Sequence, residues 1–165
     1  MRRGDLRQGS RYRFISDLVA HRDNLDGSGA FSHFNARLVA GHPWSSHQQG
    51  LLLDSETRIL TFLRVYLQFM DDMACNGFDY HKGKDELGVA VSREGRLIKL
   101  NRGLHRLAMA QYLGLPTIPV KVKAVHRDWW QGVTRGVRGA EALARVAAAL
   151  PNCTPETAPG ALDPA

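Results

Sequence analysis

The stretch between residues 87 and 125 constrains the fold more than any other part of the chain. Its two short apolar runs, 87–91 and 97–100, flank a polar turn that contains a glycine, which is typical of a β-hairpin. An amphipathic helix ending at Gly114 follows, and residues 118–125 then alternate apolar and charged side chains like a strand with one wet face. Strands that alternate with a helix over short links predict an α/β (α+β) domain with a small mixed sheet. We also expect a right-handed crossover through that helix.

The first half of the chain carries the longest helical pattern. Apolar residues recur at helical spacing between an N-cap at Asp54 or Ser55 and a stop signal at Gly77. This spacing predicts one long amphipathic helix of about 55–76, with its apolar face in the core. Weaker patterns indicate three further segments: helices near 14–21 and 140–150, and a helix or a strand at 31–39.

The length of 165 residues suits one domain with its own core. We divide the chain into a basic, partly flexible N-terminal segment (1–30), a single domain (31–150, core 84–126) and a disordered tail (151–165). The tail is rich in proline, alanine and threonine. The N-terminal segment is rich in arginine, which fits either a solvated arm or a contact with nucleic acid.

Composition narrows the classes of partner. The formal charge of +6 and the pI near 9.7 favour anionic partners such as nucleotides, nucleic acid or phosphorylated metabolites. Two distant cysteines form no disulfide framework, and no apolar run is long enough to cross a bilayer. The histidines match no standard pattern of zinc ligands. We therefore expect a cytoplasmic protein with no membrane partner and no metal held by the chain itself.

The segment Gly103-Leu104-His105-Arg106 opens the central helix and has the chemistry of a phosphate receptor. Gly103 lets a phosphate come close to the backbone, where free amides and the positive end of the helix dipole point at it. Arg106 offers a planar fork for phosphate oxygens, and His105 can donate a hydrogen bond or relay a proton, since its charge normally changes near neutral pH. Alternatively, His105 and Arg106 only cap and solvate the start of a helix.

The run from Gly88 to Val120 resembles the core of the ParB/sulfiredoxin superfamily. It has a strand pair, a Gly-x-His-Arg segment that opens a His-Arg-Leu-Ala helix, a terminating Leu-Gly and an Ile-Pro-Val strand. The resemblance covers roughly residues 84–126. It implies the compact superfamily fold and a bound nucleotide, ATP above all, with Mg²⁺. It also implies that the phosphates are held at Gly103, Leu104, His105 and Arg106.

Differences between this chain and the superfamily pattern reduce the number of reactions that we expect it to catalyse. Leu104 stands where sulfiredoxins have a catalytic cysteine, which excludes their reaction, and His105 replaces the first of two arginines usual in partitioning proteins. Arg102 replaces the aspartate common in kinase-like members, and we expect it to add positive charge together with Lys84. Glu86 is then the preferred acid or base, with His105 as the other catalytic candidate. The alternative for Glu86 is a solvated strand entry.

A second candidate group closes the last strand. His126 and Trp129 could stack on a nucleobase or a substrate, or Trp129 could instead cap the core.

Three functions remain open from the sequence. The first is a nucleotide-binding protein that acts on a small-molecule substrate as a phosphotransferase or a nucleotide hydrolase. The second is a ParB-like nucleic-acid-binding or nuclease module, in which the same segment grips a backbone phosphate and the N-terminal arginines add affinity. The third is a degenerate member that only binds partners.

Overall fold

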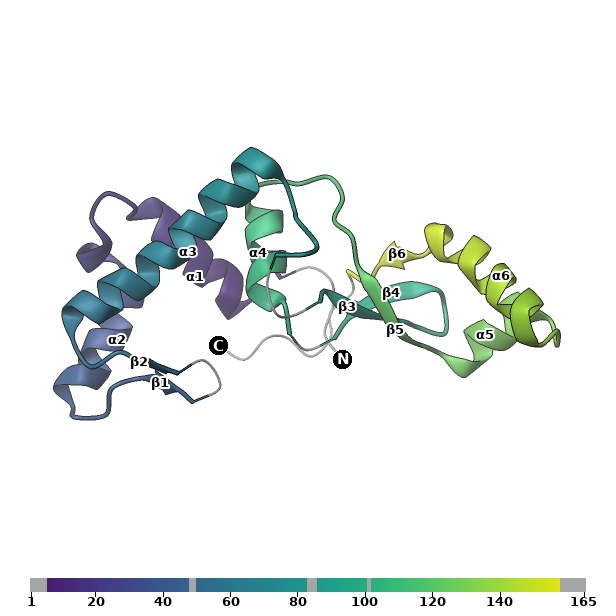
Figure 1. Ribbon diagram of the computed structural model, residues 1–165, viewed down its shortest axis with the longest axis horizontal. Coiled ribbons are helices and arrows are strands. Elements are labelled where there is room, and N and C mark those ends of the chain that lie inside the picture. Colours follow the sequence, from purple (N-terminus) through teal and green to yellow (C-terminus); the bar gives the residue numbers. More distant parts are fainter. Residues whose placement is uncertain (1–5, 48–49, 83–85, 101, 158–165) are drawn as a thin grey trace.

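The computed structural model describes residues 6–47, 50–82, 86–100 and 102–157. Three helices gather at one end of an elongated molecule, and a small sheet with two further helices lies at the other (Figure 1). Helix α4 (Leu104–Tyr112) stands between the two ends and contacts both α1 and α3. The chain is thus of mixed α and β class, as predicted. No helix in the described ranges is long and apolar enough to cross a membrane.

The helical end is built from α1 (Ser10–Ala20), α2 (Gly29–Val39) and α3 (Glu56–Asn76). Helix α3 confirms the prediction of a long helix over 55–76, with Ser55 as its N-cap and Gly77 at its end. Helix α1 begins before the expected start at residue 14, and α2 is the helical alternative for 31–39. Two short antiparallel strands, β1 (Ser45–Ser46) and β2 (Leu51–Leu52), connect α2 to α3.

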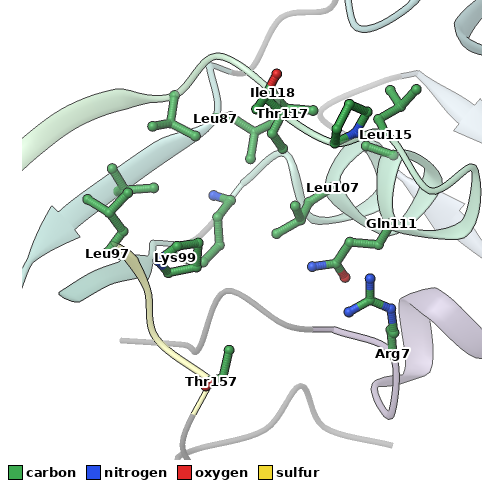
Figure 2. Close-up of a pocket in the computed structure, with 15 residues that line it drawn as sticks. Arg7, Leu87, Leu97, Lys99, Leu107, Gln111, Leu115, Thr117, Ile118 and Thr157 are labelled. Carbon is green, nitrogen blue, oxygen red and sulfur yellow. The ribbon is translucent and has the colours of Figure 1, made fainter. Parts of the chain in front are cut away.

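The sheet has the strand order β5-β3-β4-β6. Strands β3 (Gly88–Val91) and β4 (Arg96–Lys99) form the predicted antiparallel hairpin, and β5 (Lys121–Val125) pairs in parallel with β3. The side chains of Leu97 and Lys99 lie on the face of the sheet that is turned toward α4 (Figure 2).

The predicted right-handed crossover from β4 through α4 to β5 is wrong. Strand β4 runs antiparallel to β3 while β5 runs parallel to it, so β4 and β5 run in opposite directions with β3 between them. The handedness rule concerns parallel strands, and the parallel neighbours here are β3 and β5, which the chain joins through β4 and α4. Helix α4 therefore carries the chain across the hairpin to the far edge of β3.

The C-terminal part differs most from the sequence-based expectation. Helix α6 (Gly139–Ala149) was expected, but α5 (Arg127–Thr134) was not. A short 3₁₀ helix (Leu150–Asn152) then leads to β6 (Thr154–Pro155), which runs parallel to β4. The prediction of a disordered tail from residue 151 is therefore wrong for 151–157. Because β6 is an edge strand, the missing N–H of its proline costs no hydrogen bond of the sheet.

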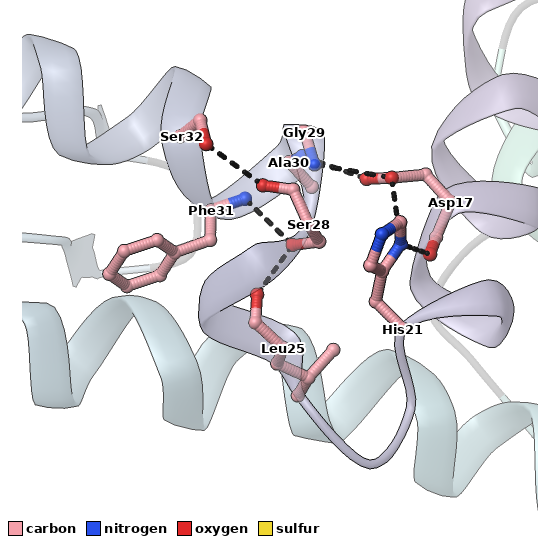
Figure 3. Close-up of polar contacts among 8 residues, drawn as sticks. All are labelled: Asp17, His21, Leu25, Ser28, Gly29, Ala30, Phe31 and Ser32. Carbon is pink, nitrogen blue, oxygen red and sulfur yellow. Dashed lines mark hydrogen bonds and ion pairs between the residues drawn. The ribbon is translucent and has the colours of Figure 1, made fainter.

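A buried serine fixes the start of α2. Ser28 has no exposed surface, and its Oγ donates to the carbonyl of Leu25 at 2.6 Å and accepts from the amide of Phe31 at 3.0 Å (Figure 3). The hydroxyl thus gives the amide of Phe31 its acceptor, and it adds a second donor to the carbonyl of Leu25, which also accepts from the backbone amide of Ser28 at 3.1 Å.

The carboxylate of Asp17 ties α1 to the same corner. It accepts from the amides of Gly29 at 3.1 Å and Ala30 at 2.8 Å, and it pairs with the imidazole of His21 at 3.2 Å (Figure 3). Serine, histidine and aspartate meet here, but the serine hydroxyl already donates to a carbonyl and is out of reach of solvent. The cluster therefore caps a helix and is not a nucleophile site.

We expect Ser28→Ala to lower the free energy of unfolding by about 1–2 kcal/mol, because it removes the acceptor of the buried Phe31 amide at the start of α2. Urea unfolding followed by circular dichroism measures this loss. Ser55→Ala is the matched control: its Oγ also caps a helix, at 3.3 Å from the amide of Arg58, but in an exposed position. Its loss should be about 0.5 kcal/mol, and equal losses in the two variants would contradict the role of burial.

Candidate anion-binding site

A buried lysine shapes the loop in front of α4. Lys99 is 1% exposed, and its Nζ donates to three carbonyls: Gly88 at 3.1 Å, Leu100 at 2.6 Å and Arg102 at 2.6 Å. The turn that follows has positive φ at Arg102 (76°) and Gly103 (66°). Reasoning from sequence missed this role. The available signal was a lysine inside an otherwise apolar run that leads straight into a glycine turn.

Gly103 is needed for its backbone conformation, because its φ of 66° is one that other residues rarely adopt, whereas a Cβ atom would meet its neighbours at ordinary contact distances. A Cβ atom there would lie 3.5 Å from the side chain of Leu87 and 3.7 Å from the carbonyl oxygen of Glu86. Leu104 is buried and packs with Leu87 and Leu107. At Leu104, therefore, the side chain belongs to the packing of α4 on the strand entry, and at both predicted phosphate positions a phosphate could be reached only through the backbone amides.

His105 points into an aromatic cluster. Its ring lies edge-on to Tyr66 and Phe14, with centroid distances of 5.3 and 5.9 Å. Burial, with a smaller contribution from Arg11, lowers its pKa to about 4. The expectation that His105 changes charge near neutral pH is therefore wrong. The neutral ring can donate one hydrogen bond, but it adds no positive charge.

Arg106 turns toward a different neighbour. Its guanidinium lies over the ring of Phe78, 4.3 Å from the centroid, and donates to the carbonyl of Asp79. Burial lowers its pKa, but an arginine in a protein stays charged. No ion pair joins Arg106 to a carboxylate among the residues that the structure describes. The segment therefore supplies one cation where the sequence predicted two.

His105 and Arg106 nevertheless share one pocket. It has a volume of about 500 Å³ and lies between α3, α4 and the loop that follows α3. Aromatic and thioether side chains form much of its wall, and Arg106 and Lys82 bring positive charge, the latter paired with Asp72 at 2.7 Å. The lining residues are Tyr66, Gln68, Phe69, Asp72, Met73, Gly77, Asp79, Lys82, His105, Arg106 and Met109.

Glu86 is held by cations. Its carboxylate accepts from Lys121 at 2.5 Å, from Lys123, and from the hydroxyl of Tyr80 at 3.2 Å. The bonds from Lys121 and Lys123 lower its pKa to about 2, so Glu86 is ionised and only weakly basic at neutral pH. These contacts favour a structural link between the strand entry and β5 over the predicted acid or base role.

The structure does not bring His126 and Trp129 to this pocket. The backbone amide of His126 donates to Val91 at the carboxyl end of β3, and its imidazole caps α5 by accepting from the amide of Asp128 at 3.1 Å. The indole of Trp129 lies against the hairpin turn at Gly95. Helix α4 begins instead beside the amino end of β3, so the two candidate groups lie at opposite ends of that strand. Lys84 lies outside the described residues.

The neighbouring carboxylates do not fit a magnesium ion held by the protein. Asp72 pairs with Lys82, Glu86 pairs with two lysines, and Asp79 accepts from the amide of His81 at 2.8 Å. Within the described ranges, no three histidine, cysteine or acidic side chains are grouped closely enough to bind a metal ion. We therefore derive no step that uses Mg²⁺.

The buried imidazole predicts a dependence of stability on pH. The unfolded chain protonates His105 near pH 6.5 and the folded chain only near pH 4, so the unfolded state binds more protons between these values. The free energy of unfolding should therefore fall as the pH drops from 6.5 to 4, by at most about 1.4 kcal/mol per pH unit from this group. Urea unfolding of the wild type and of His105→Phe over this range measures it. His105→Phe should remove that part of the slope, whereas exposed His42→Gln should keep it; equal slopes in both variants would contradict the assignment.

No protein-family model, curated protein or solved structure matches this chain. The features that bear on the function of this chain are therefore the geometry of the pocket and the resemblance over residues 84–126.

Proposed function

We propose that this protein binds a nucleotide, with ATP as the first candidate, in the pocket between α3 and α4. The observation that carries the proposal is the position of Arg106: a charged guanidinium on the first turn of a helix, at the wall of a pocket of about 500 Å³. A helix N-terminus and an arginine fork both favour a phosphate group. The contact with Phe78 holds the fork in place before a ligand arrives.

The rest of the pocket suits a nucleobase. Phe69 is 55% exposed although it is a large apolar side chain, and it lines the pocket together with Tyr66 and Met109. Stacking on aromatic side chains stabilises any planar base, whatever hydrogen-bonding groups the base carries. The neutral imidazole of His105 can add one hydrogen bond. The volume also lies within the range of small-molecule sites.

The proposal is restricted to binding. Phosphoryl transfer or hydrolysis needs a base or a positioned water, and Glu86 is engaged by two lysines. The resemblance to the ParB/sulfiredoxin superfamily supports a bound nucleotide but leaves the reaction open. The nucleic-acid alternative uses the positive charge of the N-terminal segment. Part of that charge is already neutralised, because Arg22 pairs with Asp71 at 2.6 Å. We therefore keep nucleic acid as an outcome of the tests.

We expect Arg106→Ala to weaken ATP binding by at least roughly tenfold, because a charge-assisted bond to phosphate is lost. Isothermal titration with ATP, with and without Mg²⁺, measures this. Arg64→Ala is the control, since it removes an exposed arginine of α3 that does not line the pocket. If both variants lose affinity equally, or if a single-stranded oligonucleotide competes as well as ATP, the nucleotide proposal is wrong. Thermal unfolding verifies that both variants fold.

We also expect Phe69→Ala to weaken ATP binding by roughly threefold to tenfold, since aromatic contact with a base is worth about 1 kcal/mol or more. Inorganic triphosphate should bind the variant and the wild type equally, because it has no base. Because Phe69 is exposed, Phe69→Ala should leave the stability of the fold nearly unchanged. An equal loss for both ligands would place the base elsewhere.

A further inference from the structure

The loop that follows α3 brings a second cation next to Arg106. The carbonyl oxygen of Asp79 accepts from the guanidinium of Arg106 and, at 3.3 Å, from the backbone amide of Lys82. The carboxylate of Asp79 accepts from the amide of His81 at 2.8 Å, which holds the same turn together. The backbone of Lys82 therefore lies beside the guanidinium that we propose to bind a phosphate, and both side chains line the same pocket.

The side chain of Lys82 extends from this loop to α3. Its Nζ donates to both carboxylate oxygens of Asp72, at 2.7 and 2.8 Å, and Asp72 also lines the pocket. Both side chains are open to solvent, with 55% of Lys82 and 37% of Asp72 exposed. An ion pair between exposed side chains contributes little to stability, because water and salt screen it. A ligand can therefore separate this pair at small cost.

Asp72 does not depend on Lys82 alone. The side-chain amide of Asn76, one turn later on α3, donates to the same carboxylate at 2.9 Å. If Lys82 turns away, Asp72 keeps this hydrogen bond and its contact with water, so no buried charge loses its partner. The pair can thus open without disturbing α3.

The charges that line the pocket balance in the absence of a ligand. Among its described lining residues the positive side chains are Lys82 and Arg106, and the negative ones are Asp72 and Asp79. The imidazole of His105 is neutral. Arg106 can offset the charge of one phosphate. A second or third phosphate adds negative charge that Lys82 can offset only when its ammonium leaves Asp72.

We propose that Lys82 exchanges Asp72 for the β- or γ-phosphate of the bound nucleotide, which makes the site selective for nucleoside di- and triphosphates over monophosphates. This inference rests on the proposed nucleotide function and adds the class of ligand to it. Arg106 holds the phosphate at the start of α4, and Lys82 reaches the phosphates that follow. A compact ammonium on a flexible stem suits this role, because it can turn from a carboxylate to a phosphate while its backbone stays in place.

Isothermal titration of the full chain with AMP, ADP and ATP measures this selectivity, without Mg²⁺ so that the phosphates keep their full charge. Lys82→Gln should weaken ATP and ADP by roughly fivefold, the effect of one charge-assisted contact less the ion pair given up, and should change AMP by less than about twofold. Asp72→Asn should tighten ATP by roughly threefold, because it removes the competitor for Lys82. Lys123→Gln is the matched control and should change nothing, since its ammonium also pairs with a carboxylate, that of Glu86, but does not line the pocket.

The two substitutions in the ion pair distinguish this exchange from a purely structural role. If the pair only holds the loop against α3, the loss of either partner weakens AMP, ADP and ATP alike, and that result would overturn the inference. Equal effects of Lys82→Gln and Lys123→Gln on ATP would overturn it as well. Thermal unfolding without ligand should show that every variant folds like the wild type, because the pairs concerned are exposed.

The inference and the nucleotide proposal fail on different measurements. Arg106→Ala should weaken AMP and ATP alike, so its loss of affinity supports nucleotide binding whatever Lys82 does. If the wild type binds ATP in a way that needs Arg106 but is indifferent to Lys82→Gln, only the inference is wrong. If the wild type binds none of the three nucleotides, both are wrong.

Discussion

The three hydrogen bonds of the Lys99 ammonium fix the position of α4, on which the candidate site depends. They join the end of β4 to the first residue of β3 and to the turn that precedes α4. A buried charge is tolerated only when its donors are satisfied, so the three carbonyls must stay in place for the ammonium to remain inside. The turn with positive φ at Arg102 and Gly103 is thereby set, and with it the direction in which α4 leaves the sheet.

The two faces of helix α4 carry different kinds of side chain. One face turns a charged guanidinium and a neutral imidazole toward the aromatic side chains of α3. The other face turns leucine, alanine and glutamine side chains toward the open side of the sheet. The proposed nucleotide pocket therefore uses the side chains of only one face of α4.

The predictions that succeeded are those whose signal is local. The hairpin over 88–99 follows from two apolar runs and a turn, and α3 follows from helical periodicity with a serine cap and a glycine stop. The prediction of a crossover from β4 to β5 was wrong because β5 pairs with the far edge of β3. Local sequence patterns do not encode which edge of the sheet a strand joins. The prediction of disorder was wrong for residues 151–157 because β6 is only two residues long and gains its order from β4.

The sequence by itself determined the residues that could bind an anion, since Gly103 and Arg106 are recognised by their chemistry and by their place at the start of a helix. Only the tertiary structure decided what those residues do. Packing against Tyr66 and Phe14 keeps the imidazole of His105 neutral, because its charged form would lose water without gaining a partner. The direction of β3 likewise decided that the tryptophan at 129 and the glycine turn at 103 lie at opposite ends of one strand.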